Sequence, residues 1–134
     1  HVWLAPGIIS RYQQTQHDGY KRLILDCADN YVQSAPSRSD DVTAGTVGNV
    51  MLLLNTAFRI SGSEAYLKRA EWFGQWAATY LWPDDHPLPL PSRSARHDIY
   101  AASSRCDTLA MAMLDTWQLR VRPETTVSLL PTDR

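Results

Sequence analysis

The sequence lacks several features that mark well-known classes of protein. No apolar run approaches the roughly 18 residues that a membrane-spanning helix requires, and the longest, Val50 to Leu54, has the size of a core helix segment. There is no start methionine and no basic segment followed by an apolar one, so no signal peptide is visible. We therefore expect no membrane partner, and we expect the chain to be either a processed form or a piece of a larger protein.

Cysteine is scarce and charge is balanced. Cys27 and Cys106 are isolated, with no CxxC pair. Because cysteine is so often buried, two thiols are favoured over a disulfide, although sequence alone settles neither the disulfide nor the compartment. The 13 Lys plus Arg face 14 Asp plus Glu, a net charge of −1, so we expect no nucleic-acid partner. His17 and His86 are not at ligand spacing, so we expect neither a metal site nor a cofactor.

The composition that remains is that of one globular domain. The chain of 134 residues and 15.1 kDa is long enough for one hydrophobic core but not for two. Four segments, 20–31, 47–58, 66–80 and 99–117, carry apolar residues three or four apart, the spacing of a helix packed on its neighbours. The sequence therefore predicts an all-α fold, with a helical domain over 1–119. From 120 to 134 it predicts an irregular tail or a short strand.

Turn residues mark the ends of these helices. Gly62 suits the left-handed residue that ends the second helix, and Ser61 or Ser63 suits the N-cap of the third. Between Trp82 and Pro91 four prolines exclude a continuous helix. We expect this stretch to be a long connection that is ordered or semi-extended.

A weak internal repeat has a period of 46 residues. It aligns Tyr12 with Phe58, Thr15 with Ser61, Asp18 with Glu64, Tyr20 with Tyr66 and Arg22 with Lys68. The Thr-x-x-Asp and Ser-x-x-Glu pairs are similar to capping boxes, and the period has the size of a two-helix unit, although helix starts also resemble one another by chance. Projected backwards, the repeat begins before residue 1, unless Pro6 and Gly7 open a shortened helix. Because such units need neighbours, we expect antiparallel helical hairpins in an incomplete segment, the C-terminal portion of a longer protein.

Two stretches carry a resemblance to a known family. They read GTVGNVMLLLNTAFRISGSEAYLKRAEWFGQWAATYLW (45–82) and RHDIYAASSRCDTLAMAMLDTW (96–117). An inner helix, a Ser-Gly-Ser turn, an outer helix opening with Tyr-Leu and a further inner helix follow in order. This pattern, over roughly residues 8–117, resembles the α/α-toroid (α/α-barrel) carbohydrate-active enzymes, polysaccharide lyase-like or glycoside hydrolase-like.

The resemblance implies stacked hairpins around a central cleft and a polysaccharide or oligosaccharide partner. The reaction would be β-elimination of a uronic-acid polymer or hydrolysis, and a secreted or periplasmic location is compatible with either. Terpene-cyclase-like enzymes also contain such hairpins, but their DxDD and DDxxD runs are absent. The main alternative is a non-catalytic helical-repeat domain that binds or scaffolds a partner.

The densest group of candidate site residues lies between the proline-rich connection and the fourth helix. A lyase must neutralise a sugar carboxylate, remove the neighbouring proton and protonate the leaving oxygen. Arg93 and Arg96 would bind carboxylates, His97 would be the base or neutraliser, and Tyr100 the acid or base. Asp98 would contact substrate, or act in hydrolysis if a second carboxyl lies opposite. The alternative is that these residues cap and pair helix ends.

A second group opens the second helix. The two glycines in GTVGN (45–49) would let a ligand approach the backbone, and Thr46 and Asn49 would bind sugar hydroxyls. The alternative is close helix packing through the glycines. Trp82 is the candidate sugar platform. Core or hairpin packing is the interpretation for the remaining tryptophans of the predicted helices, Trp72, Trp76 and Trp117.

Overall fold

The computed structural model describes residues 2–36, 42–82, 84, 87–93 and 104–124. It contains a 3₁₀ turn, η1 (Val2–Leu4), and the helices α1 (Ala5–Thr15), α2 (Asp18–Val32), α3 (Ala44–Ser61), α4 (Glu64–Leu81) and α5 (Cys106–Val121). The all-α prediction is confirmed for the described residues, whose one β feature is an isolated antiparallel bridge between Thr43 and Ser92. None of the helices in these ranges is long and apolar enough to cross a membrane.

Helix α3 lies at the centre of the molecule. From Ala44 to Ala57 all its residues except Thr46 are buried, and it contacts each of the other four helices. An α3 sequence that is apolar on every side explains this position, because such a helix is stable only when neighbours surround it. The core therefore runs along α3, with α4 and α5 as its most extensive neighbours.

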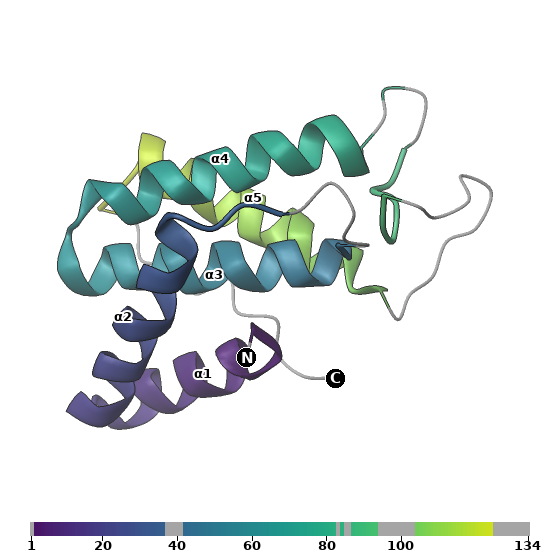
Figure 1. Ribbon diagram of the computed structural model, residues 1–134. Coiled ribbons are helices and arrows are strands. Elements are labelled where there is room, and N and C mark those ends of the chain that lie inside the picture. The colour runs from purple at the N-terminus through teal and green to yellow at the C-terminus, as the bar shows by residue number, and fades with distance from the viewer. Residues whose placement is uncertain (1, 37–41, 83, 85–86, 94–103, 125–134) are drawn as a thin grey trace.

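The helices alternate in direction along the chain. Helices α1, α3 and α5 run one way, α4 returns antiparallel to them, and α2 crosses back obliquely (Figure 1). We call α1–α2 the first hairpin and α3–α4 the second hairpin. The described part of the connection from α4 to α5, 87–93, lies at the end where α3 and α5 begin, opposite the two hairpin turns (Figure 1).

The repeat of 46 residues corresponds to structure. Helix α1 ends at Thr15 and α3 at Ser61, and α2 begins at Asp18 and α4 at Glu64. Both pairs of boundaries are separated by the period read from the sequence. The two hairpins therefore share the length and position of their turn, although α1 is shorter than α3 at its start.

The two turns also agree in their hydrogen bonds. Gln16 and Gly62 are the left-handed C-cap residues, with φ of 51° and 71°. Their amides donate to Tyr12 O and Phe58 O, both at 2.7 Å. The hydroxyls of the preceding residues donate to carbonyls four residues back, Thr15 to Arg11 at 2.7 Å and Ser61 to Ala57 at 2.8 Å. The match between the two turns therefore extends from residue types to backbone conformation.

The capping-box interpretation of these turns is wrong. Helix α2 is capped by His17, whose Nδ1 accepts a bond from the Gly19 amide at 3.0 Å. Helix α4 has Ser63 as its N-cap residue, without a side-chain cap bond. Thr15 and Ser61 instead close the preceding helix, so the paired Thr-x-x-Asp and Ser-x-x-Glu residues span the turn rather than open a helix.

Two helices differ from the sequence prediction. A short first helix is present, as in the alternative that Pro6 and Gly7 open one: α1 begins at Ala5, with Pro6 in its first turn. Helix α5 begins at Cys106, after a left-handed Arg105 with φ of 56°, and runs on to Val121. Trp117 is not a core residue, because 60% of it is exposed.

A polar network joins the later half of α3 to α5. Arg59 makes two bonds to the carboxylate of Asp115, at 3.0 and 2.5 Å, and Asp115 is almost fully buried. Asn55 donates to the same carboxylate at 3.0 Å and exchanges bonds with Thr116. The buried charge is thus compensated by a bidentate arginine and an amide, which makes the pairing of these two helices specific.

Candidate functional site

The proline-rich connection is ordered where it crosses the starts of α3 and α5. Pro91 O accepts the Ala44 amide at 2.9 Å, and the Leu90 amide donates to Leu81 O, the last residue of α4, at 2.6 Å. The Cys106 thiol at the start of α5 donates to Pro89 O at 3.3 Å. The described part of this connection, 87–93, is therefore held by three helices, as the sequence prediction of an ordered segment requires.

Thr46 lies at this end and takes part in the helix cap. Its amide donates to Thr43 Oγ1 at 3.2 Å, and the two hydroxyls lie 2.9 Å apart. Thr46 is half-buried. A hydroxyl pair of this kind retains one hydrogen and further lone pairs for another group, so the end of α3 still offers a polar contact beyond its own cap.

The glycines at the start of α3 serve close helix packing. A Cβ placed on Gly48 would lie 2.7 Å from both the amide nitrogen of Leu109 and the carbonyl carbon of Thr108. One on Gly45 would lie 2.7 Å from Ser104 O. The packing alternative for these glycines is therefore the one that the structure supports, and it draws the first turns of α3 and α5 together.

Two polar side chains are enclosed near this helix contact. Asn49 on α3 and Thr108 on α5 are both completely buried. The amide nitrogen and oxygen of Asn49 and the hydroxyl of Thr108 have no hydrogen-bond partner in the described part of the chain. A buried polar group without a partner costs about 1–3 kcal/mol. A ligand hydroxyl would need to enter the protein interior to meet Asn49.

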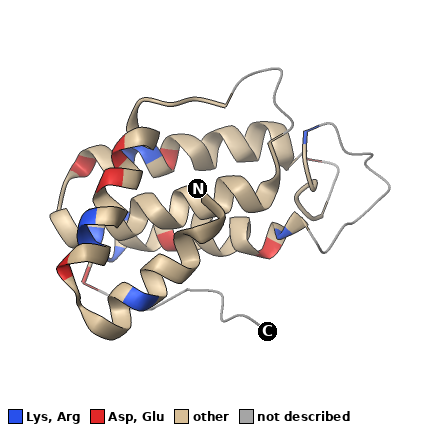
Figure 2. Ribbon diagram, turned by 60° about the horizontal axis from the view of Figure 1, so that its bottom comes forward, with Lys and Arg blue, Asp and Glu red and all other residues tan. Residues whose placement is uncertain are grey.

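Aromatic and cationic groups gather at the last turns of α4. The Arg93 guanidinium lies 4.9 Å from the ring centroid of Tyr80, and the Tyr80 and Trp76 rings are 5.2 Å apart. Trp82, the C-cap residue of α4, is half-buried, and Arg93 is exposed. A guanidinium that lies against an aromatic ring still offers N–H donors to a carboxylate. Most charged residues lie toward the opposite end, where the hairpin turns are (Figure 2).

The predicted catalytic residues lie outside the described residues. Arg96, His97, Asp98 and Tyr100 belong to the segment 94–103, so their roles remain predictions. Of the predicted site residues, the structure brings Thr46 and Arg93 to the same end of the molecule, where Thr43 and Ser92 form the isolated bridge. Asn49 lies deeper, and Trp82 lies where α4 gives way to the connection.

Two further expectations concern cysteine and metal. Cys27 and Cys106 are both free thiols, the first half-buried and the second buried. Within the described ranges, no three His, Cys, Asp or Glu side chains form a group that could hold a metal ion. The described geometry therefore offers binding by hydrogen bonds, stacking and a guanidinium.

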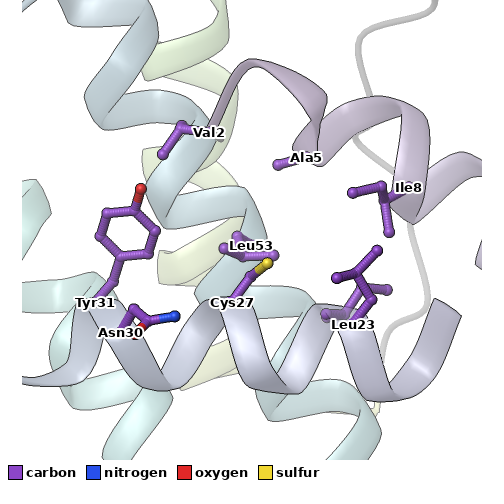
Figure 3. Close-up of a pocket in the computed structure, with 9 residues that line it drawn as sticks. Val2, Ala5, Ile8, Leu23, Cys27, Asn30, Tyr31 and Leu53 are labelled. Atoms are coloured by element: carbon purple, nitrogen blue, oxygen red, sulfur yellow. The ribbon is translucent and has the colours of Figure 1, made fainter. Parts of the chain in front are cut away.

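Sequence reasoning missed a crevice between the two helices of the first hairpin (Figure 3). It has a volume of about 390 Å³. Its walls come from η1, α1 and α2 and its floor from α3, and it is lined by Val2, Ala5, Ile8, Leu23, Ile24, Cys27, Asn30, Tyr31 and Leu53. Burial raises the pKa of Tyr31, with a smaller contribution from Cys27. The signal in the sequence is weak, because Leu23 and Cys27 look like ordinary core positions of an amphipathic helix.

Comparison with known proteins does not assign the chain to a family. No protein-family model, no curated protein and no solved structure matches it. The resemblance to the α/α-toroid enzymes therefore depends on the sequence pattern.

Proposed function

We propose that this chain is part of an α/α-toroid carbohydrate-active protein and that it binds an acidic polysaccharide or oligosaccharide at the end where α3 and α5 begin. The observation that carries the proposal is the cluster of Trp76, Tyr80 and Arg93 at that end, with Trp82 two residues beyond Tyr80 in the chain. Aromatic rings offer flat faces to sugar rings, and an exposed guanidinium offers paired donors to a uronate carboxylate.

The arrangement of the helices supports the same proposal. The chain forms two hairpins with matched turns, and a helix parallel to α1 and α3 follows them (Figure 1). A toroid of inner and outer helices would have its helices in this order. The connection 87–93 lies across the starts of two successive inner helices. A long connection at a helix end, held by a rigid scaffold, is a common location for binding residues.

The proposed chemistry is β-elimination. A base removes the proton beside the uronate carboxylate, the bond from the adjacent ring carbon to the leaving oxygen breaks, and that oxygen is protonated. We assign carboxylate binding to Arg93 and Arg96, and proton transfer to His97 and Tyr100. Thr46 and Asp98 would contact sugar hydroxyls, and Trp82 would stack on a ring. A glycoside hydrolase would instead use two carboxyl groups across the scissile bond.

Binding is tested by calorimetric titration with oligogalacturonate, alginate oligosaccharides and a neutral glucan. We expect the acidic ligands to bind, and Arg93→Ala to weaken that binding by about tenfold, as for loss of one charge-assisted contact. Arg11→Ala is the matched control, because Arg11 is an exposed arginine on α1 at a distance from this end. Equal loss from both variants, or no binding of any glycan, would refute the proposal.

Turnover is followed by the ultraviolet absorbance of the carbon–carbon double bond, conjugated to the carboxylate, that elimination creates. With an acidic polymer that binds, we expect His97→Ala and Tyr100→Phe to abolish the increase while binding persists. Unchanged rates in both variants would remove the catalytic assignment. A chain that binds glycan without forming new reducing ends or double bonds would be the non-catalytic repeat domain instead.

A further inference from the structure

The crevice of the first hairpin occupies a surface that is covered in the second hairpin. Leu23 and Cys27 on α2 correspond, 46 residues on, to Arg69 and Phe73 on α4. Leu23 is 42% exposed and Cys27 half-buried, whereas Phe73 is 4% exposed. The same face of an equivalent helix is therefore open in one hairpin and closed in the other.

Helix α2 is what closes that face in the second hairpin. The Tyr66 hydroxyl on α4 donates to the Asp29 carboxylate on α2 at 2.6 Å. Arg69 on α4 donates to Tyr31 O at 3.0 Å and also to Ser34 O, at the end of α2. An oblique outer helix thus packs on the next outer helix through a carboxylate and its terminal carbonyls.

The first hairpin retains the tyrosine of this contact but not the carboxylate. Tyr20 occupies the position of Tyr66, and its amide makes the same bond, to His17 O at 3.0 Å, that Tyr66 makes to Ser63 O at 3.1 Å. Its hydroxyl has no carboxylate partner among the described residues, where the ring meets only His17 edge-on.

We propose that the crevice between α1 and α2 is the docking site of an amphipathic helix with the surface pattern of α2, the outer helix of a further hairpin of the same repeat. Its carboxylate accepts the Tyr20 hydroxyl, as Asp29 accepts that of Tyr66. Its apolar side chains fill the space between Ile8 and Leu23. The inference rests on the repeat and not on carbohydrate binding, so each proposal can fail without the other.

The test uses a peptide of residues 17–34 as the docking helix. A free peptide of this length is barely helical in water, so a hydrocarbon staple joins positions 23 and 27 of the peptide. In the protein these positions line the crevice toward α1. The staple also replaces the peptide's cysteine, so only the protein is alkylated. The peptide is titrated onto the 134-residue chain, and the alkylation of Cys27 by iodoacetamide is followed by mass spectrometry. Cys106, which is 3% exposed, is the slow internal reference. We expect saturating peptide to slow Cys27 alkylation at least tenfold.

A double-mutant cycle separates specific docking from apolar adhesion. We expect Asp29→Asn in the peptide to weaken binding about tenfold, as does Tyr20→Phe in the protein, with little further loss when the two are combined. Tyr80→Phe, on another helix, is the matched control and leaves the affinity unchanged. Independent, additive losses would overturn the proposed contact.

A second pair of variants tests the crevice without touching the core. Leu23→Lys places a charge in the open wall and should abolish protection of Cys27. Leu114→Lys is the matched control, because Leu114 is 55% exposed and lies on α5. Three results would overturn the proposal: no protection by the peptide, protection that grows with protein concentration without peptide, and protection by decanoate but not by peptide. The second would indicate a further copy of the chain, and the third a small apolar ligand.

Discussion

The two hairpins have the same turn but different surroundings. Their helix ends and turn hydrogen bonds coincide at a spacing of 46 residues. The second hairpin lies between α2 and α5, whereas within the described residues the first hairpin has helical neighbours on one side only and retains an open crevice. The comparison teaches that the turn is determined by its own residues, while burial of a helix face depends on what packs beside it.

Helices α1 and α3 differ in how each meets the next helix that runs in the same direction. Val2 of η1 and Ile9 of α1 correspond, 46 residues on, to Gly48 and Asn55 of α3. Val2 and Ile9 give the α1–α3 contact an apolar character. Gly48 brings the backbones of α3 and α5 together, and Asn55 joins the buried network of Asp115. The α3–α5 contact is therefore the closer and the more specific of the two.

The largest effect is expected where the backbones of α3 and α5 touch. Gly48→Ala places a Cβ 2.7 Å from backbone atoms of Thr108 and Leu109, which cannot rotate away as a side chain would. We expect it to lower the free energy of unfolding by about 3 kcal/mol. Urea denaturation followed by circular dichroism measures this change.

Gly7→Ala on α1 is the matched control for that substitution. A Cβ there meets nothing within 4 Å, so the higher helix propensity of alanine should raise stability by about 0.5–1 kcal/mol. If both variants change stability equally, close packing is not what distinguishes the α3–α5 contact.

The next effect concerns the buried carboxylate. Asp115→Ala leaves Arg59 and Asn55 without their shared acceptor. Arg59 is about one-third exposed and can regain water, so we expect a loss below the usual range for a broken buried pair, about 2 kcal/mol. Glu71→Ala, which removes an exposed partner of Arg120, should change stability far less. Comparable losses would show that Asp115 is no more important than a surface ion pair.

Much of this fold could be predicted from the sequence, because its signals are local. The spacing of apolar residues indicates α2, α3 and α4, and Gly62 marks the turn between the last two. The sequence predicts α1 only as an alternative, because this helix is short and its buried residues are few, Ala5 and Ile9. The predicted start of the fourth helix is wrong, because the left-handed conformation of Arg105 cannot be inferred from its residue type.

The candidate site was predictable only in part, for a physical reason. The residue types Arg93 and Thr46 indicated polar chemistry at helix ends, and the structure brings both to one end. The role of the glycines of α3 depends on Ser104 and Thr108, which lie about 60 residues away in the chain. Contacts at such separation, including Asn55 with Asp115, have no local pattern. The crevice was missed for the same reason.

A smaller effect distinguishes the two equivalent tyrosines. Tyr66→Phe removes a bond to the Asp29 carboxylate, and we expect a loss of about 1.5 kcal/mol at neutral pH. Tyr20→Phe is the control in the first hairpin and should have little effect, since its hydroxyl meets no carboxylate in the described chain. Equal effects of the two substitutions, in thermal or urea unfolding, would contradict the assigned difference.

The same contact predicts a dependence on alkaline pH. The bond to Asp29, with burial and the nearby carboxylates, raises the pKa of Tyr66 to about 12 from its ordinary 10.0. The folded state therefore holds this proton more tightly than the unfolded state. Its contribution to stability is complete below pH 10.0 and is lost as the pH rises to about 12. Unfolding curves across this window should fall less steeply for Tyr66→Phe than for the unsubstituted protein.

The smallest expected effect exchanges the residues at the two turns. Gln16 adopts a left-handed conformation that glycine adopts at lower cost, and its counterpart is Gly62. Gln16→Gly relieves that cost but loses side-chain bonds to Tyr12 O and Gln13 O, so we expect a gain of only about 0.5 kcal/mol. Gly62→Gln should cost about 1 kcal/mol, because φ is 71° there. Thermal unfolding of both variants measures the difference. Opposite signs are expected because the turns share one backbone geometry, and a loss in both would mean that the side chain of Gln16 stabilises its turn more than a glycine backbone does.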